Sequence, residues 1–291
     1  MPKFIHLPLE IVSTLEELNK VLAPYRANKQ KIGFVPTMGA LHKGHLSLIN
    51  IAKEHNDIVV ASIYVNPTQF NDPKDLEKYP RPLDEDEEML TKAECDVLFI
   101  PTASEMYPKG DFSTLKEDFG NMDKVMEGKS RPGHFAGMIT IVSKLFDAVK
   151  PDNAYFGSKD FQQLTLVKYF VLNHKLPINI VSCPIVREAD GLAMSSRNRL
   201  LSVEEREHAT HISQTLLKAR ELWGTMDIPE LKKCIEEAFA KDDFLKLDYF
   251  EIVYAETLTP VEGPLIRAIP VVACIAAYDG NVRLIDNMQL A

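Results

Sequence analysis

The first two thirds of the chain alternate between short apolar runs and longer stretches in which apolar residues recur at helical spacing. Five runs predict buried strands at residues 31–35, 57–65, 96–100, 153–156 and 178–182. Four stretches predict helices between or after them, at residues 47–55, 83–94, 135–149 and 160–173. Strands separated by helices indicate βαβ units, so we predict an α/β fold: a Rossmann-like parallel sheet with helices on both faces.

The pattern changes after about residue 184. Two predicted helices, 203–223 and 229–240, precede three strand-like runs at 247–254, 269–277 and 282–285. We interpret this part as a smaller C-terminal α+β domain and place the boundary between residues 185 and 186. Ligands bind beyond the carboxyl ends of strands in open parallel sheets, so a site is expected in the loops after Val35, Val65, Phe156 and Val186.

Composition argues against several classes of protein. Hydrophobic residues make up 45% and charged residues 26%, as in an ordinary globular protein. The net charge of -9 disfavours a nucleic-acid-binding protein, because phosphate contacts need a basic excess. The start shows no secretory signal, and the longest apolar runs fall short of the ~20 residues of a membrane-spanning helix. Four separated cysteines fit reduced thiols in the cytoplasm and argue against a zinc cluster or a disulfide frame.

The loop at residues 36–45, PTMGALHKGH, carries the strongest chemical pattern. Gly44 stands where the next helix should begin, and its missing Cβ lets an anion approach backbone N–H groups at the positive end of the helix dipole. His42 and His45 lie within one turn, so both can face that anion and stabilise charge on a leaving pyrophosphate. The plain alternative is that two histidines cap an ordinary turn. The segment resembles the HxGH motif of the nucleotidylyltransferase superfamily, whose members act at the α-phosphate of a nucleotide.

Two further loops carry side chains suited to the same chemistry. Gln69 follows a predicted strand and can both donate to and accept from a ligand that displays a hydroxyl beside a carboxylate. In the loop 155–163, Lys159 can reach phosphates, Asp160 can accept from ribose hydroxyls, and Gln163 lies one helical turn further on. The plain alternatives are a surface glutamine after a turn and an acidic residue at a helix start, which helix dipoles favour.

The loop 186–198 ends in two serines and Arg197, which together can form a compact phosphate clamp. It resembles the Lys-Met-Ser-Lys-Ser loop of the same superfamily, and mobile segments at a junction of two domains often close over nucleotides. The acidic run 84–88 predicts a solvated helix start, because carboxylates are favoured in a first turn. One of these carboxylates can reach Mg²⁺ through water, but the sequence assigns none of them.

Together the loops resemble one family, the pantothenate synthetases or pantoate–β-alanine ligases. The resemblance rests on PTMGALHKGH (36–45), VNPTQF (65–70), YPR (79–81), SRPGHFAG (130–137), FGSKDFQQ (156–163), READGLAMSSRN (187–198) and RLIDN (283–287). These pieces follow in the family's order over nearly the whole chain. The resemblance implies an ATP- and pantoate-binding domain at residues 1–185 and a C-terminal lid domain at residues 186–291.

The resemblance also implies a set of site residues. Those implied to contact ATP are Met38, Gly39, Ala40, Leu41, His42, Lys43, Gly44, His45, Gly157, Ser158, Lys159, Asp160, Val186, Met194, Ser195, Ser196 and Arg197. It places pantoate at Gln69 and Gln163, with β-alanine also near Gln69, and labels His45 the proton donor. One position departs from the family pattern, since Ser158 stands where Glu is expected, which weakens any role for a carboxylate there.

The family's reaction has two steps, with ATP and Mg²⁺ expected at the site. Pantoate attacks the α-phosphate of ATP to give pantoyl adenylate and pyrophosphate, and β-alanine then displaces AMP to give pantothenate. The pantoate carboxylate is already ionised at neutral pH, so the first step needs no base. We therefore interpret His45 primarily as an electrostatic stabiliser and only secondarily as a proton donor. No residue is identified as a base for the amine, and no Mg²⁺ ligand is assigned.

Other functions share parts of this pattern. A nucleotidylyltransferase that stops after joining AMP or CMP to a phosphorylated acceptor has HxGH but does not account for the glutamine loops or SRPGHF. A non-catalytic nucleotide sensor would bind ATP tightly without turnover. A fragment of an aminoacyl-tRNA synthetase is disfavoured by the acidic balance and the short second domain. The family resemblance further suggests a homodimer with small-molecule substrates, and neither a nucleic acid nor a membrane as partner.

Overall fold

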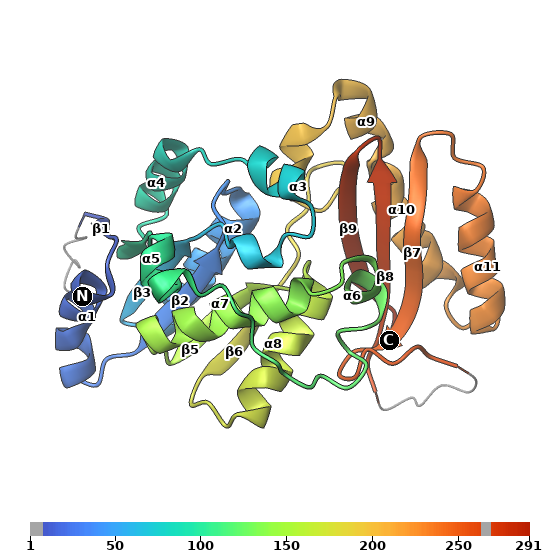
Figure 1. The fold of residues 1–291 in the computed structure, drawn as a ribbon. Helices are drawn as coiled ribbons and strands as arrows, with labels where there is room; N and C mark the ends of the chain where they lie inside the picture. The colour runs from blue at the N-terminus through green and yellow to red at the C-terminus, as the bar shows by residue number, and fades with distance from the viewer. Residues whose placement is uncertain (1–7, 263–268) are drawn as a thin grey trace. The chain divides into compact units, whose positions relative to one another are not determined.

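The structure is a computed structural model that describes residues 8–262 and 269–291. By internal contacts the chain divides into two compact units, whose elements are labelled in Figure 1. Unit 1 consists of Met1–Asp118, Gly133–Gly157 and Val167–Cys183. Unit 2 consists of Phe119–Pro132, Ser158–Leu166 and Pro184–Ala291.

Unit 1 is built on a six-stranded sheet. In spatial order its strands are β1 (Glu10–Val12), β4 (Val97–Phe99), β3 (Ile58–Ile63), β2 (Ile32–Thr37), β5 (Asn153–Gly157) and β6 (Asn179–Cys183). All neighbouring strands pair in parallel. The central strands β2, β3 and β5 are almost continuously apolar, as expected for strands buried on both faces. The predicted parallel sheet is confirmed.

Helices cover both faces of this sheet. The longer ones are α1 (Leu15–Ala27), α2 (Lys43–His55), α4 (Leu83–Lys92) and α7 (His134–Val149), while α8 (Phe161–Asn173) runs from unit 2 into unit 1. Val35 of β2 shares a core with Ile49 of α2 and Leu90 of α4. Its neighbour Phe34 meets the edge of the Phe146 ring of α7, with centroids 6.4 Å apart. Because successive side chains of a strand point to opposite faces, α2 and α7 lie on opposite sides of the sheet.

The strand order reverses between β2 and β5. From β2 the chain moves to β3 and β4 on one side, and it later returns to β5 and β6 on the other. The loops that follow Thr37 and Gly157 therefore leave the sheet from adjacent strands. Such a switch point is where open parallel sheets bind ligands. Both loops are among those that the sequence pattern indicated.

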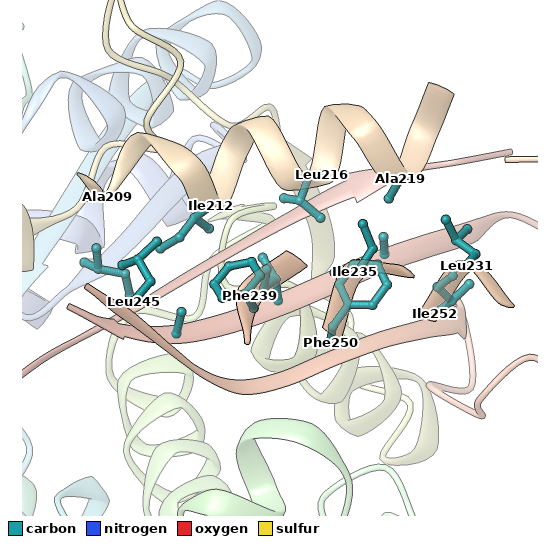
Figure 2. Packing of buried hydrophobic residues seen from close by; sticks show 14 of the residues in the cluster. Ala209, Ile212, Leu216, Ala219, Leu231, Ile235, Phe239, Leu245, Phe250 and Ile252 are labelled. Atoms are coloured by element: carbon teal, nitrogen blue, oxygen red, sulfur yellow. The ribbon is translucent and has the colours of Figure 1, made fainter. Parts of the chain in front are cut away.

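Unit 2 is built on a three-stranded antiparallel sheet in the order β7 (Leu245–Tyr254), β8 (Val271–Asp279) and β9 (Val282–Gln289). Helices α10 (Thr210–Leu222) and α11 (Ile228–Phe239) cover one face of it. Figure 2 shows their apolar side chains, including Leu216 and Ile235, packed with Phe250 of β7. The predicted C-terminal sheet is confirmed.

Two earlier segments of the chain group with this sheet. The short helix α6 (Met126–Ser130) contacts β7, and β9 holds the loop before α8 through hydrogen bonds to Ser158 and Lys159. Contacts therefore place residues 119–132 and 158–166 in unit 2, although both precede the predicted boundary between residues 185 and 186. The division into functional domains at 1–185 and 186–291 stays a prediction.

Several elements differ in extent from the prediction. The helix predicted at 203–223 is two helices, α9 (Val203–His208) and α10. Strand β9 continues four residues beyond the predicted end, because its polar residues still pair with β8. The pattern also missed β1 and α1, as well as the short helices α3 (Pro73–Lys78), α5 (Ala103–Met106) and α6. Within residues 8–262 and 269–291, no helix is long and apolar enough to span a membrane.

Candidate active site

The HxGH loop connects β2 to α2. The backbone turns sharply at Gly39 and Ala40, which have positive φ angles of 77° and 51°. Helix α2 then begins at Lys43, with His42 as its N-cap residue. The side chain of Met38 is partly buried and that of Lys43 is exposed.

The two histidines cap the helix reciprocally. His42 Nδ1 accepts a hydrogen bond from the Gly44 N–H at 3.1 Å, and His45 Nδ1 accepts one from the His42 N–H at 3.3 Å. A ring nitrogen that accepts a hydrogen bond carries no proton, so the proton of each neutral ring lies on Nε2. Both rings, whose centroids are 4.1 Å apart, therefore carry an N–H donor at Nε2. We expected the Gly44 N–H to be available to an anion, but it is bonded to His42.

Asp86 of α4 holds the same loop. Its Oδ2 accepts a hydrogen bond from the Ala40 N–H at 2.8 Å, and its Oδ1 accepts one from the Leu41 N–H at 2.7 Å. A Cβ on Gly39 would lie 2.9 Å from Asp86 Oδ2, so the glycine permits this close approach. The two N–H groups are thus directed to a carboxylate of the protein, and the side chain of Leu41 lies in the core.

The burial of Asp86 contradicts the prediction of a solvated acidic run. Asp86 is 1% exposed, whereas Asp84, Glu85 and Glu88 are exposed. The reason is helical geometry, since residues four apart share a face of a helix and Asp86 stands four residues before the buried Leu90. One carboxylate of the run is therefore structural.

Gln69 lies at the end of the short helix η1 (Pro67–Gln69), after β3, and is 6% exposed. Its Oε1 accepts a hydrogen bond from Asn66 Nδ2 at 3.2 Å, and its Nε2 lies 3.0 Å from Met38 Sδ. Tyr107 donates to Asn66 Oδ1 at 2.7 Å, which turns the Asn66 amide nitrogen toward Gln69. The Gln69 amide is thereby oriented, with its nitrogen toward the HxGH loop.

The segment SRPGHFAG packs α7 against this glutamine loop. His134 Nδ1 lies 2.7 Å from the Gln69 carbonyl oxygen, and Asn66 Nδ2 also donates to the Gly137 carbonyl at 3.0 Å. A Cβ on Gly137 would lie 2.2 Å from the Thr68 carbonyl oxygen, so a larger residue would push the helix and the loop apart. This motif therefore fixes the backbone that carries Gln69.

In unit 2, β9 holds the loop that precedes α8. Asn287 Nδ2 donates to the carbonyl oxygens of Ser158 at 2.8 Å and Lys159 at 2.9 Å. Lys159 Nζ lies 3.8 Å from Asp160 Oδ1, a loose ion pair that a phosphate group can displace. Ser158 takes part in this arrangement through its carbonyl group, so the loop is built without the expected glutamate side chain.

The two glutamines of FGSKDFQQ have different environments. Gln162 is 5% exposed, and its Nε2 donates to the carbonyl oxygens of Met122 at 2.7 Å and Val125 at 2.9 Å. Its Oε1 accepts from the Glu127 N–H at 3.1 Å. The Gln162 amide thus holds the protein together, whereas Gln163 is only partly buried. This difference favours Gln163 as the residue of the pair that meets a ligand.

A tight hairpin precedes the serine–arginine loop. The Met194 N–H donates to the Val186 carbonyl at 3.0 Å and closes the hairpin. Arg187 Nη1 donates to the Gly191 carbonyl at the tip at 3.0 Å. The same guanidinium makes a bidentate pair with Asp286 of β9, at 2.6 and 3.0 Å. β9 therefore anchors this hairpin as well as the loop before α8.

The predicted clamp residues follow the hairpin. Ser195 caps the short helix η3 (Ser196–Leu200), because its Oγ accepts a hydrogen bond from the Arg197 N–H at 3.3 Å. Met194 is 9% exposed. Ser195, Ser196 and Arg197 are all partly exposed, and the Ser195 hydroxyl, which accepts from Arg197, can still donate its own hydrogen, so the three-residue clamp stays a prediction.

The predicted site residues are divided between the units. Residues 38–45, Gln69 and Gly157 belong to unit 1, while Ser158, Lys159, Asp160, Gln163, Val186 and residues 194–197 belong to unit 2. In the part of the chain that the structure describes, no group of three or more His, Cys, Asp or Glu side chains is arranged to hold a metal ion.

Comparison with known proteins decides the family. The family model of the pantoate-β-alanine ligases matches residues 10–289. The chain belongs to the pantoate–β-alanine ligase family. It is 48% identical over 281 residues to the pantothenate synthetase of Bacteroides thetaiotaomicron, covering 97% of this chain and 99% of that protein. A pantothenate synthetase of Thermotoga petrophila is 47% identical over 284 residues, covering 97% of this chain and all of that protein.

Solved structures of the family have the same fold. A pantothenate synthetase from Thermus thermophilus matches with a TM-score of 0.89 at 41% identity, covering 97% of this chain and 99% of that one. A pantoate-β-alanine ligase from Francisella tularensis, complexed with β,γ-ATP and β-alanine, matches with a TM-score of 0.80 at 37% identity, covering 97% and 98%. The chain is therefore a ligase of pantothenate synthesis.

Sequence reasoning missed the residues that support this ligase site. Asp86 was hidden because it stands among four other acidic residues. Asp286 and Asn287 belong to RLIDN (283–287), one of the segments on which the family resemblance rests, but nothing in that segment predicts which residues its side chains contact. Asn66 and Gly137 also lie in recognised segments. The supporting role of each of these residues is visible only from the distant residue that it contacts in the structure.

Proposed function

We propose that this ligase condenses pantoate with β-alanine through a pantoyl-adenylate intermediate, with ATP cleaved to AMP and pyrophosphate. The observation that carries the proposal is the reciprocal capping of His42 and His45, which places the ring proton of each neutral imidazole on Nε2. Such donors suit an anion whose charge increases as the reaction proceeds. ATP itself is supported as a substrate by the Francisella relative, which was solved with β,γ-ATP.

In the first step, a pantoate carboxylate oxygen attacks the α-phosphorus of ATP. A bond from that oxygen to phosphorus forms, the bond to the bridging oxygen breaks, and pyrophosphate leaves with the electron pair. The carboxylate is already ionised, so the protein needs to position the reactants and stabilise the phosphate charge. We assign that stabilisation to His42 and His45 through Nε2–H, together with Lys159 and Arg197.

We further propose that His45 acts as a neutral hydrogen-bond donor. A proton donor would have to be an imidazolium, with protons on both ring nitrogens. The proton on Nδ1 would then oppose the His42 N–H that donates to this atom. The capping geometry therefore favours electrostatic stabilisation by His45 over proton transfer.

In the second step, the amine of β-alanine attacks the carbonyl carbon of the adenylate. The carbon–nitrogen bond forms, the bond from carbon to the phosphate oxygen breaks, AMP leaves with the electron pair, and the nitrogen loses a second proton to AMP or water as the amide forms. The attacking nitrogen needs its lone pair, so the ammonium proton is lost first, and water can accept it. We assign pantoate to the oriented amide of Gln69 and to Gln163, with β-alanine near Gln69.

We propose that the remaining residues predicted for ATP also contact ATP. They are Met38, Gly39, Ala40, Leu41, Lys43, Gly44, Gly157, Ser158, Asp160, Val186, Met194, Ser195 and Ser196. The N–H groups of Ala40 and Leu41 already donate to Asp86, so contacts of these two residues with ATP would use other atoms. Mg²⁺ enters as part of the substrate, bound to the phosphates of ATP, since this ion keeps several waters and takes few protein ligands.

The test follows pyrophosphate release in a single turnover with ATP and pantoate, without amine. The wild-type chain is expected to release one pyrophosphate per active site and to form pantothenate when β-alanine is added. A nucleotidylyltransferase or a nucleotide sensor would release none under these conditions, and that result would overturn the proposal.

Two substitutions of His45 test the donor role in the same assay. His45→Ala is expected to slow the release by about 10²- to 10³-fold, the usual effect of removing one such donor. His45→Gln keeps an N–H at nearly the position of Nε2 and should retain clearly more activity than His45→Ala. Equal loss in both variants would contradict the donor role.

We also propose that the enzyme is cytoplasmic and forms a homodimer. Both follow from the family resemblance, and the separated cysteines agree with a reducing compartment. Sedimentation equilibrium of the full chain tests the oligomeric state, and a monomer over the working concentration range would contradict it.

A further inference from the structure

The side chain of Asn287 makes an uncommon pair of hydrogen bonds. One amide nitrogen, Nδ2, donates to two consecutive carbonyl oxygens, those of Ser158 at 2.8 Å and Lys159 at 2.9 Å. An amide nitrogen has two N–H bonds, so this group is fully used by the pair. The loop thus presents two successive C=O groups to the same atom of β9.

Peptide planarity turns this contact into a constraint on two N–H groups. In a trans peptide the C=O and N–H bonds point in opposite directions. The carbonyls of Ser158 and Lys159 point at Asn287, so the N–H groups of Lys159 and Asp160 point away from it. The Lys159 N–H has no acceptor among the described residues, whereas the Asp160 N–H closes the turn at residues 158–159. Both lie directly before α8, which begins at Phe161, so the positive end of the helix dipole adds to them.

The position of Asn287 makes the constraint rigid. The residue is 6% exposed and pairs with Cys274 of the central strand β8. Its own N–H donates to Asp286 Oδ1 at 2.7 Å, and Asp286 is in turn locked by Arg187.

We propose that Asn287 is a positioning residue for the ATP step: it holds the peptides of Ser158 and Lys159 so that the N–H group and the side chain of Lys159 face the phosphates of ATP. The inference rests on the proposed binding of ATP at this loop. Asn287 itself touches no substrate. Its effect is to keep the N–H group and the side chain of Lys159 in the orientation that ATP needs.

The experiment replaces Asn287 by Asp in the full chain and measures steady-state kinetics for ATP and for pantoate. A carboxylate has nearly the same shape but no N–H, and it repels the two carbonyl oxygens. The KM for ATP is expected to rise by about tenfold or more, the factor that corresponds to roughly 1.4 kcal/mol. The KM for pantoate should change less, because Gln69 is held by Asn66 and His134 and Gln163 is held within helix α8.

The matched control is Gln289→Glu, the same amide-to-carboxylate change two residues further along β9 at an exposed position. It should leave both KM values at the wild-type level. If Asn287→Asp does not fold by circular dichroism, Asn287→Ala carries the same prediction without the repulsion. A role in folding alone would lower kcat through a smaller active fraction and leave the KM for ATP unchanged, and that outcome would overturn the inference.

The two proposals fail in different ways. If the wild-type chain forms no pantothenate from ATP, pantoate and β-alanine, the proposed function is wrong. If the wild type is active and Asn287→Asp keeps its KM for ATP, the positioning role is wrong and the proposed function stands.

Discussion

The most direct test of the HxGH loop is the replacement of Asp86 by Asn. The carboxylate accepts hydrogen bonds from the Ala40 and Leu41 N–H groups at 2.8 and 2.7 Å, and it is 1% exposed. A hydrogen bond to a charged group contributes about 1.5–3 kcal/mol to stability, and a neutral one about 0.5–1.5 kcal/mol. Asparagine keeps one acceptor oxygen, so one bond becomes neutral and the other is lost. Its NH₂ group would also face a buried N–H.

The sum of these losses is roughly 2–4 kcal/mol. For a chain of this size that lowers the melting temperature by roughly 5–10 °C. Activity should fall as well, because Ala40 and Leu41 directly precede His42. Thermal unfolding followed by circular dichroism measures the first effect, and kcat/KM for ATP measures the second.

Asp84→Asn is the matched control, since it makes the same change of charge at an exposed position of the same acidic run. It should melt with the wild type and keep its activity. If Asp86→Asn also melts within about 2 °C of the wild type with kcat/KM intact, the carboxylate does not hold the loop and the reasoning is refuted.

Three further substitutions test other contacts. Gly137→Ala places a Cβ 2.2 Å from the Thr68 carbonyl oxygen, so it should raise the KM for pantoate and lower stability by about 1–3 kcal/mol, and a pantoate titration with wild-type kinetics would contradict this. Arg187→Lys loses the bidentate contact with Asp286 and should lower the urea midpoint by the equivalent of about 1–3 kcal/mol, whereas an unchanged midpoint would argue against the anchor. Burial raises the pKa of Asp279 from 3.8 to about 6, so this carboxyl costs stability as the pH rises through that window. The free energy of unfolding of Asp279→Asn should therefore increase by about 1–3 kcal/mol relative to that of the wild type as the pH rises from about 4 to 7. Urea titrations at both pH values measure this difference, and a decrease would show the sign to be wrong.

The fold could be predicted because its strands are buried on both faces. Runs such as Ile58–Ile63 are apolar at nearly every position, which is the pattern of a central parallel strand. Edge strand β1 was missed because it has three residues, of which only Val12 is buried. The end of β9 was missed because Asp286 and Asn287 are polar and buried, and period-two alternation cannot detect such positions.

The residues predicted to face ATP lie in short contiguous motifs, which is why sequence alone could suggest them. The supporting residues lie far from the loops that they hold. Asp86 is separated from Ala40 by 46 positions, and Asn287 is separated from Ser158 by 129. A single sequence contains no information on which polar residue meets which backbone group over such distances. In addition, Asp86 looked like an ordinary member of a solvated helix start.

The two loops that precede α2 and α8 are held by opposite chemistry, and this difference determines what each can offer to a phosphate. Asp86 is an acceptor, so it uses up the backbone N–H groups of Ala40 and Leu41. The two histidines at the start of α2 carry their ring protons on Nε2, because each Nδ1 accepts a backbone hydrogen bond. Asn287 is a donor, so it bonds to carbonyl groups, and in our proposal this directs the Lys159 N–H toward ATP. These contacts do not use the side chain of Ser158, so they do not require the glutamate expected at that position.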